Sequence, residues 1–385
     1  MTALAGVRIL DLSRLLPGPL ATLVLADLGA QVDKIEDPEA GDYARNMPPL
    51  VGGHGAAFHV LNRGKRSAVL DLKRPEGVRA FERLVLHYDV VFEQFRPGVL
   101  DRLGLGHERL LELHPKLVVA ALTGYGQSGP LCERAGHDLD YLARAGLLGL
   151  QGPSDGKPQI PAFQVADVSG ALFGVIAIIA ALYERARTGK GKIIDIAMLD
   201  SVIPFATITL SRLLGGELPS RGAELLTGGI AGYDIYLTKD GQAVALGALE
   251  PKFLLSFCKA AGIEASESAL IPGPHQAELK RTFTEVFASK TRADWEAFGS
   301  QHDCCLEPVL RPDELLSDPQ ILARGVFFEG TETGTRVRYY RTPVTPRENL
   351  PRPAPNHGEH TEPIFREAGF DDEEIMQLRR NRIIR

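Results

Sequence analysis

Short apolar runs alternate with stretches of helical periodicity in the first part of the chain. Residues 7–12 are typical of a buried strand, the proline-rich turn at 17–19 leads into a helix over 20–28, and residues 31–36 predict the next strand. Gly29 is placed to end the intervening helix. Further helices are predicted at 75–88 and 108–114, and further strands at 89–95 and 116–122. This alternation predicts a mainly parallel sheet with helices on both faces.

The second half of the chain has a different texture. A glycine- and proline-rich loop at 151–161 precedes a long apolar helix over 168–187, and residues 192–198 return as a strand. Its longest apolar run, 171–182, is expected to be a buried helix, because it is too short to span a bilayer. Beyond about residue 215 we predict a hairpin of strands 233–237 and 243–246, helices at 252–261 and 276–289, a proline-rich linker at 343–355 and a helix at 371–380.

These patterns predict an α/β protein with two domains and no internal repeat. A large Rossmann-like domain with a doubly wound parallel sheet is expected over residues 1–200, followed by a linker at 201–221. A smaller α+β domain is expected over 222–330, and residues 331–385 are expected to form a linker and a C-terminal return to the large domain. A length of 385 residues also favours two domains over a single core.

The charge balance narrows the class of partner. Lys and Arg number 43 against 49 Asp and Glu, giving a net charge of −6, and 44% of the residues are hydrophobic. This acidic balance argues against a general nucleic-acid binder or a protein that binds anionic membranes. A local basic patch for a phosphorylated ligand remains compatible with it.

The cysteines indicate a reducing compartment. Cys132, Cys258, Cys304 and Cys305 form no Cys-x-x-Cys pair, so neither a disulfide framework nor a zinc site is expected. The N-terminus shows no basic segment followed by an apolar run, so no secretion signal is expected and the cytoplasm is the predicted location. The pair His357 and His360 falls in a proline-rich tail, and we expect no metal there.

The first strand–helix–strand unit invites a dinucleotide interpretation. Glu36 ends the second strand, where an acid that binds ribose would stand. The preceding turn, however, reads Pro17-Gly18-Pro19 and lacks the Gly-x-Gly-x-x-Gly fingerprint. A scaffold with a proline-stiffened turn is therefore favoured over an NAD enzyme.

Several loops at predicted strand ends are candidates for ligand binding. Arg63 and Lys65 flank Gly64, Arg96 stands on a turn after a strand, and Tyr125 and Gly126 lie in a glycine-rich loop after another. Arg and Lys at strand ends suit phosphate groups, and a glycine loop brings backbone N–H groups close to a ligand. Solvated surface charge and a plain turn are the alternative interpretations.

Four acid or base residues are candidates for chemistry. His137 adjoins Asp138, a carboxylate that can orient an imidazole, and Asp167 follows about thirty residues later. A structural histidine is an alternative, and Asp167 precedes the long helix and can be its N-cap, which would lower its pKa. Glu250 precedes Pro251 and can likewise start a helix.

Taken in order, the motifs resemble the family III CoA-transferase superfamily (CaiB/BaiF type), which contains formyl-CoA transferase, carnitine CoA-transferase and α-methylacyl-CoA racemase. The resemblance covers nearly the whole chain. Its supporting segments are 11–19, 26–30, 62–67, 95–98, 123–130, 188–191 and 195–200.

Within that superfamily, Asp167 matches the aspartate that transferases use as nucleophile and racemases use as an acid/base. The Gly-His137-Asp138 segment resembles the racemase branch, where the histidine is the second acid/base, and Glu250 matches a glutamate that lines the racemase site from the partner subunit. Asp33 and Asp140 depart from the usual pattern, with an acid at an apolar position and in place of Asn.

The resemblance implies an interlocked homodimer and an acyl-CoA substrate. Arg63, Lys65, Arg96, Tyr125, Gly126 and Tyr141 become candidates for contacts with CoA. The function it favours is inversion of C2 in 2-methylacyl-CoA thioesters, as part of fatty acid and lipid metabolism. Transfer of CoA through Asp167 is the alternative, and a non-catalytic protein that binds CoA esters is a third; the preferred acyl chain stays open.

The implied racemisation would pass through an enolate. Neutral His137 would take a proton from one enantiomer while protonated Asp167 returns one to the opposite face. Asp138 would hold the imidazole, and no cofactor beyond the CoA moiety of the substrate is needed. This requires the pKa of Asp167 to be raised toward neutrality by burial, helped by Glu250, whereas the N-cap interpretation requires it to be lowered.

Overall fold

The computed structural model describes residues 2–264, 266–332, 334–348 and 351–385. They form two compact units. The first comprises Met1–Tyr141, Gln164–Val202 and Pro319–Arg385, and the second comprises Leu142–Phe163 and Ile203–Asp318. The domain limits expected from composition stay a prediction.

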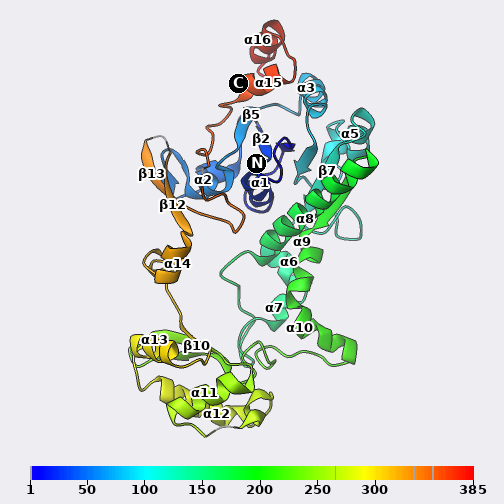
Figure 1. The fold of residues 1–385 in the computed structure, drawn as a ribbon. Coiled ribbons are helices and arrows are strands. Elements are labelled where there is room, and N and C mark those ends of the chain that lie inside the picture. Colours follow the sequence, from blue (N-terminus) through cyan, green and yellow to red (C-terminus); the bar gives the residue numbers. More distant parts are fainter. Residues whose placement is uncertain (1, 265, 333, 349–350) are drawn as a thin grey trace. The chain divides into compact units, whose positions relative to one another are not determined.

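The first unit is built on a six-stranded parallel sheet (Figure 1). Its strands are β1 (Arg8–Asp11), β2 (Gln31–Glu36), β5 (Arg66–Val69), β6 (Val90–Glu93), β7 (Val118–Thr123) and β8 (Lys192–Ala197), in the order β5-β2-β1-β6-β7-β8. After β5 the chain crosses to the other side of β1 to form β6. The predicted α/β class and the parallel sheet are therefore confirmed, and the order reverses between β1 and β6, where doubly wound sheets bind ligands.

Helices cover both faces of this sheet. On one face α1 (Pro17–Asp27) packs against α8 (Val165–Thr188). On the other, a core cluster joins buried residues of the sheet to α3 (Pro75–Val85), α5 (His107–Leu113), α15 (Thr361–Glu367) and α16 (Asp372–Arg380). The C-terminal helices thus complete the core of the first unit by burying Ile364, Phe365 and Ile375 in it.

The turn into α1 explains the Pro-Gly-Pro sequence. Pro17 opens the helix, where its missing N–H removes no helical hydrogen bond. A Cβ on Gly18 would lie 2.1 Å from the Cβ of Ser13 and 2.7 Å from the side-chain oxygen of Gln94. Only glycine lets the start of α1 approach the ends of β1 and β6 this closely.

Helix α8 is longer than the apolar run that predicted it. At 24 residues it is long and apolar enough to cross a membrane by length and composition, as is the segment Met198–Gly215. Half of the apolar window of α8 is buried in the protein, as in the core helices of globular proteins, which meet the same criterion. The helix ends at Gly189, whose φ of 72° is the left-handed conformation that glycine adopts readily.

The second unit holds a three-stranded antiparallel sheet, β11 (Leu306–Pro308), β10 (Ala243–Gly247) and β9 (Tyr233–Leu237). The predicted hairpin of β9 and β10 is confirmed. Helices α11 (Pro251–Ala261), α12 (Gln276–Phe287) and α13 (Arg292–Gln301) share its core, where Phe257 stacks on Phe287 with ring centroids 5.2 Å apart.

Several elements escaped prediction. Among them are β5, α2 (Ala56–Asn62), α14 (Pro319–Arg324) and the hairpin of β12 (Phe327–Glu332) and β13 (Thr335–Tyr340). A short helix, α6 (Asp138–Arg144), follows Gly136. The remaining short elements are η1 (Tyr43–Asn46), β3 (Leu50–Val51), β4 (His54–Gly55), α4 (Val99–Arg102), α7 (Leu147–Leu150), α9 (Met198–Val202), η2 (Ile203–Ala206), α10 (Thr207–Leu210), η3 (Ser211–Gly215), η4 (Glu267–Leu270) and η5 (Glu314–Leu316). Within the predicted linker, residues 349–350 lie outside the described ones, and the others form no helix or strand.

Candidate active site

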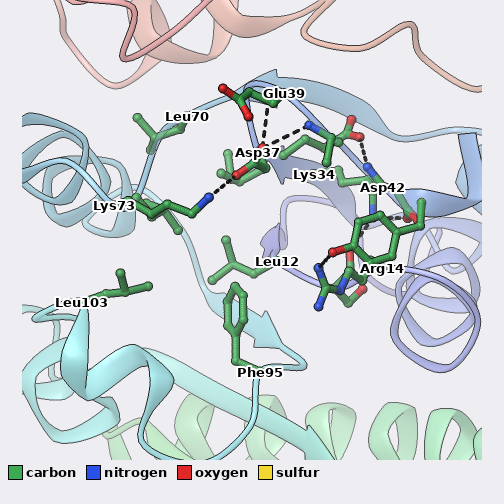
Figure 2. Close-up of a pocket in the computed structure, with 17 residues that line it drawn as sticks. Leu12, Arg14, Lys34, Asp37, Glu39, Asp42, Leu70, Lys73, Phe95 and Leu103 are labelled. Atoms are coloured by element: carbon green, nitrogen blue, oxygen red, sulfur yellow. Dashed lines mark hydrogen bonds and ion pairs between the residues drawn. The ribbon is translucent and has the colours of Figure 1, made fainter. Parts of the chain in front are cut away.

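A pocket of about 440 Å³ lies where β1, β2, β5 and β6 end. Its apolar side is made by leucines and one aromatic ring, and Figure 2 shows Phe95 pointing toward Leu12, with Leu103 beside them. Its polar side carries Arg14, Lys34, Glu36, Asp37, Glu39, Asp42, Tyr43 and Lys73. The pocket therefore occupies the carboxyl ends of parallel strands next to the point where their order reverses.

Two features give this pocket a place for a flat, anionic ligand. The guanidinium of Arg14 lies over the ring of Tyr43, 4.4 Å from its centroid, and donates to its hydroxyl at 2.8 Å, so the two flat side chains pack together at the pocket. Lys73 pairs with Asp37 at 3.0 Å and is largely exposed. An adjoining pocket of about 680 Å³ shares Asp37, Glu39 and Lys73 and is also lined by Arg74, Arg379, Arg382 and Arg385.

Beneath the pocket lies a buried charge network of Asp11, Lys34, Asp42 and Lys65. Lys34 pairs with Asp42 at 3.0 Å, and Lys65 pairs with Asp11 at 3.2 Å. Burial alone would raise the pKa of Asp11, but the charges of the two lysines and hydrogen bonds from hydroxyl groups outweigh it and lower that pKa. Burial lowers the pKa of Lys65 to about 8, against the opposing effect of Asp11. Each charge in this network faces an opposite one.

Arg63 and Lys65 were predicted to contact CoA, but both side chains are buried and bind acidic partners within the protein. Arg63 is 1% exposed and binds Asp27 through two hydrogen bonds of 2.6 and 2.9 Å. Lys65 is 2% exposed and donates to Asp11, to Thr22 at 2.7 Å and to Asn62 at 3.0 Å. The geometry gives these two residues a place in the scaffold and does not support their assignment to a ligand.

A second polar cluster lies at the start of α8. The carboxylate of Asp138, at the first residue of α6, accepts hydrogen bonds from the backbone N–H of Ala166 at 2.7 Å and of Asp167 at 3.1 Å. Asp138 was expected to hold the imidazole of His137, but among the described residues its side chain bonds to α8 instead. This contact joins the segment that carries His137 to the helix that carries Asp167.

Asp167 has the electrostatics of a proton carrier. It stands in the first turn of α8 and is half-buried, with no cation paired to it among the described residues. Burial, and then the charge of Asp138, raise its pKa to about 7. We call Asp138 and Asp167 the acid pair. The alternative expectation, that Asp167 caps the helix and has a lowered pKa, is wrong, because α8 has no side-chain cap from its N-cap residue Gln164 and Asp138 takes the N–H groups.

Two tyrosines shape this cluster. The hydroxyl of Tyr141 donates to the carbonyl of Gly136 at 2.6 Å, and its ring meets Tyr125 edge-on with centroids 5.1 Å apart. Burial and the charge of Asp167 raise the pKa of Tyr141. A Cβ on Gly124 would lie 2.4 Å from the Tyr141 ring, so this glycine makes room for the tyrosine beside Asp167.

Gly126 and Arg96, also predicted to contact the ligand, differ in whether their hydrogen-bonding groups are already used. The N–H of Gly126 donates to the side chain of Thr123 at 3.0 Å, so it is not free for a ligand oxygen. Arg96 is exposed on the turn after β6, and its charge acts on Tyr141. It is therefore the predicted cation whose charge reaches Tyr141.

His137 and Glu250 keep unengaged side chains. His137 is exposed, and only its backbone N–H and carbonyl make hydrogen bonds, the N–H donating to Asp140 at 3.0 Å. Glu250 is the N-cap residue of α11 in the second unit, and its side chain caps nothing. Neither imidazole nor carboxylate has a hydrogen-bond partner among the described residues. Their roles stay predictions.

The sequence pattern missed the walls of the pocket. Arg14 and Lys73 gave no signal, because each stands in an irregular segment after a strand, and Tyr43 gave none because it lies in the short helix η1. Asp42 offered one: it starts η1 by accepting the N–H of Ala44 at 3.0 Å, and an acid at such a position predicts a helical turn. No group of three or more potential metal ligands gathers in the part of the chain that the structure describes.

Comparison with known proteins finds similarity along nearly the whole chain. The sequence profile of CoA-transferase family III matches residues 4–361. The chain is 38% identical to the human alpha-methylacyl-CoA racemase, over 99% of this chain and 97% of that protein. It is also 34% identical to the mouse succinyl-CoA:glutarate CoA-transferase, over 98% of this chain and 89% of that one.

The fold has a close counterpart among solved structures. A CAIB/BAIF family protein from Brucella suis superposes with a TM-score of 0.83 at 32% identity, covering 95% of this chain and 99% of that one. The similarity in sequence and in fold spans both compact units.

Proposed function

The chain belongs to CoA-transferase family III, and from this premise we propose that it inverts C2 of 2-methylacyl-CoA thioesters. One observation carries the proposal: Asp167 is half-buried, faces a second carboxylate, and has a pKa raised to about 7 by burial and by Asp138. Such a group takes up and releases a proton near neutral pH, which a racemase needs from its acid/base.

The chemistry sets what the site must supply. A thioester carbonyl acidifies its α-carbon, yet that proton is still held far more tightly than a proton on a carboxyl or imidazole group. Every tenfold difference in acidity is worth about 1.4 kcal/mol, so the enolate must be stabilised directly. The N–H groups of Ala166 and Asp167 are taken by Asp138, and the enolate oxygen therefore needs other donors.

In the proposed reaction, His137 and Asp167 work on opposite faces of C2. Neutral His137 accepts the proton as the C–H bond breaks, and its electron pair passes into the enolate. Protonated Asp167 then donates its proton to the other face, which forms the new C–H bond and leaves a carboxylate beside an imidazolium. The opposite enantiomer uses the two groups in exchanged roles, and the unengaged side chain of His137 supports this assignment.

The pocket at the strand ends supports a place for the CoA moiety. The flat side chains of Arg14 and Tyr43 suit stacking of a nucleotide base, and Lys73 lines both this pocket and the adjoining one that Arg74 and the C-terminal arginines line. Arginine and lysine side chains of this kind bind phosphate. Arg96, whose charge acts on Tyr141, is a further cation that could contact the ligand.

Isotope exchange tests the proposed function. The protein with a 2-methylacyl-CoA in deuterated water should place deuterium at C2 and bring both enantiomers to the same mixture. His137→Ala should reduce this exchange by about 100-fold or more, since a positioned acid/base contributes about that much. His275→Ala, in the second unit, is the matched control and should keep the wild-type rate. Retention of protium at C2 while binding persists would contradict racemisation and favour a CoA-ester binding protein.

The second candidate function is transfer of CoA. Its support is the 34% identity to a succinyl-CoA:glutarate CoA-transferase. Asp167 would then attack an acyl-CoA, expelling CoA thiolate and giving an enzyme anhydride. The thiolate would attack the aspartyl carbonyl, breaking the anhydride bond, so that the donor acid leaves as its carboxylate and an aspartyl-CoA thioester forms. Hydroxylamine trapping or a CoA-sized mass increase on the Asp167 peptide would support transfer. His137→Ala should spare transfer while it removes racemisation.

We also propose that the protein is a homodimer. Helix α8 exposes an apolar face at helical spacing, with Ile176 60% and Tyr183 68% exposed, flanked by Leu172, Phe173 and Ile179. Apolar surface of this kind on one face of a helix suits a second protein chain. Light scattering should give twice the chain mass, and Ile176→Glu, which disrupts this face while the chains fold and assemble, should give the mass of one chain. Interlocking of the two chains, with Glu250 reaching the partner's site, is part of the same proposal.

The proposed reaction uses no cofactor beyond the CoA moiety of its substrate, because the thioester itself accepts the electron pair. The enzyme is proposed to work in the cytoplasm, without a membrane or a nucleic-acid partner. Activity that survives dialysis against a chelator, and a cytosolic fraction that holds the activity, are the expected outcomes.

A further inference from the structure

The first turn of α8 is capped from outside the helix. Its N-cap residue, Gln164, makes no side-chain bond to the helix, and Asp138 of α6 accepts the N–H groups of Ala166 and Asp167 at 2.7 and 3.1 Å. The first N–H groups of a helix lack partners within it and carry the positive end of its dipole. A carboxylate that accepts two of them is held firmly in place.

This contact gives Asp138 and Asp167, the two carboxylates at the start of α8, different hydrogen bonding. Asp167 stands in the first turn and would, without Asp138, be a natural acceptor for these N–H groups. Because Asp138 already accepts them, Asp167 receives none of the hydrogen bonds that stabilise a carboxylate. Ionising both acids of the pair so close together costs free energy, and the hydrogen bonds from α8 make Asp138 the one that is ionised at the lower cost.

The other charged groups around Asp167 do not offset this. Among the described residues, Asp138 and Tyr141 are the titratable groups that act on it or respond to it. The hydroxyl of Tyr141 donates to Gly136 and not to Asp167. Arg96 acts on Tyr141, but no ion pair joins it to Asp167 in the part of the chain that the structure describes.

We propose that Asp138 is a positioning residue for Asp167: it caps α8, fixes the helix start against α6, and by its charge keeps Asp167 as the acid that carries the exchangeable proton. The inference rests on the proposed function for its catalytic meaning, whereas its physical content concerns Asp167 alone. It replaces the expectation that Asp138 orients the imidazole of His137.

Asp138→Asn separates the two parts of this role. The amide oxygen can still accept both N–H bonds, but the negative charge is gone. The titration of Asp167 is followed through the ¹³C chemical shift of its labelled carboxyl carbon. In Asp138→Asn the proton affinity of Asp167 should fall about tenfold, since a neighbouring like charge is worth at least that much. Asp138→Ser also removes the charge while keeping an acceptor, and should give a shift in the same direction. Thermal stability should change little in Asp138→Asn.

Asp140→Asn is the matched control. Asp140 lies two residues further along α6 and also accepts a backbone N–H, that of His137 at 3.0 Å, but among the described residues it accepts no hydrogen bond from α8. Its substitution removes the same charge from the same short helix and should leave the titration of Asp167 unchanged. The pH profile adds a kinetic readout: in Asp138→Asn the alkaline limb of kcat/KM should move to lower pH for the enantiomer that Asp167 protonates.

An unchanged Asp167 titration in both Asp138→Asn and Asp138→Ser would overturn the proposal. So would a changed titration of His137 with that of Asp167 unaltered, because that pattern assigns Asp138 to the imidazole. A shifted Asp167 titration in a protein that exchanges no deuterium at C2 would support the role of Asp138 while the proposed function fails. The two results are therefore separable.

Discussion

Two groups of carboxylates within one compact unit behave in opposite ways. In the buried charge network, Asp11 lies against Lys34 and Lys65, and these charges lower its pKa although burial opposes them. In the acid pair, Asp167 lies against Asp138 with no paired cation among the described residues, and burial and the like charge raise its pKa to about 7. Both groups lie at the carboxyl edge of the parallel sheet, since the start of α8 and the end of β1 face that edge.

The difference separates scaffold from chemistry. A buried carboxylate beside a lysine keeps its charge and gains stability from the pair, so it has no reason to exchange protons near neutral pH. For a half-buried carboxyl group beside another carboxylate, ionisation costs extra free energy. Groups with pKa values perturbed in this way are concentrated at functional sites. The charge of the neighbouring group, a cation beside Asp11 and a carboxylate beside Asp167, therefore distinguishes the candidate proton carrier more than burial does.

The largest effect on activity is expected from Asp167→Asn. The amide fits the same space but exchanges no proton, so deuterium incorporation at C2 should fall by about 1000-fold or more. The protein should remain folded, because no cation loses its partner. Asp140→Asn serves as the control and should keep most of the activity. Exchange within tenfold of the wild-type rate in Asp167→Asn would remove Asp167 from the mechanism.

The same substitution in the buried charge network should damage stability. Asp11→Asn leaves Lys65 without its paired carboxylate and removes one of the carboxylates that act on Lys34, in a site that is closed to solvent. The free energy of unfolding should fall by about 3–5 kcal/mol, as for other buried pairs that lose one partner. Chemical denaturation measures this change. A loss below about 1 kcal/mol would show that the network does not depend on charge balance.

Stability as a function of pH should distinguish the two groups further. Because the folded-state pKa of Asp167 is about 7 and its ordinary value is 3.8, the wild type loses stability as the pH rises through this interval. Asp167→Asn should therefore be more stable than the wild type at pH 8, by about 1 kcal/mol after allowance for partial exposure, with the difference shrinking toward pH 4. A variant that is less stable at pH 8 would contradict the raised pKa.

The smallest effect on stability is expected at the solvent side of the pocket. Lys73 is 77% exposed, so its ion pair with Asp37 is screened by water. Lys73→Ala should leave the melting temperature unchanged within error, but raise KM for the CoA ester several-fold with kcat unchanged if Lys73 binds phosphate. Lys116→Ala, on the loop before β7, is a control with the same charge change. Equal effects of both variants on KM would point to net charge alone.

The sheet was readable from the sequence because its strands are short apolar runs separated by helices of ordinary length. β2 was predicted at its observed bounds, and β9 likewise. β5 was missed because Arg66 opens it with a charged side chain that pairs with Asp33 in β2 at 2.7 Å. That pairing also explains Asp33, which departs from the apolar pattern expected of a buried strand.

The site was only partly readable from the sequence. Asp167 and His137 were found as candidates, but spacing cannot say which acceptor a helix N–H will choose, and so the capping role of Asp138 was missed. Arg63 and Lys65 looked like surface cations because their acidic partners, Asp27 and Asp11, lie far away along the chain. Contacts between distant segments decided each of these cases.

The acid pair can be tested most directly by titrating one carboxyl group. With aspartate ¹³C-labelled at the carboxyl carbon, the difference between wild-type and Asp167→Asn spectra assigns the Asp167 signal, and its chemical shift can be followed from pH 4 to pH 9. A midpoint near 7 is the predicted result, since burial and Asp138 both disfavour its charge. A midpoint near the ordinary value of 3.8 would contradict the account, because Asp167 would then be a carboxylate like those of the scaffold.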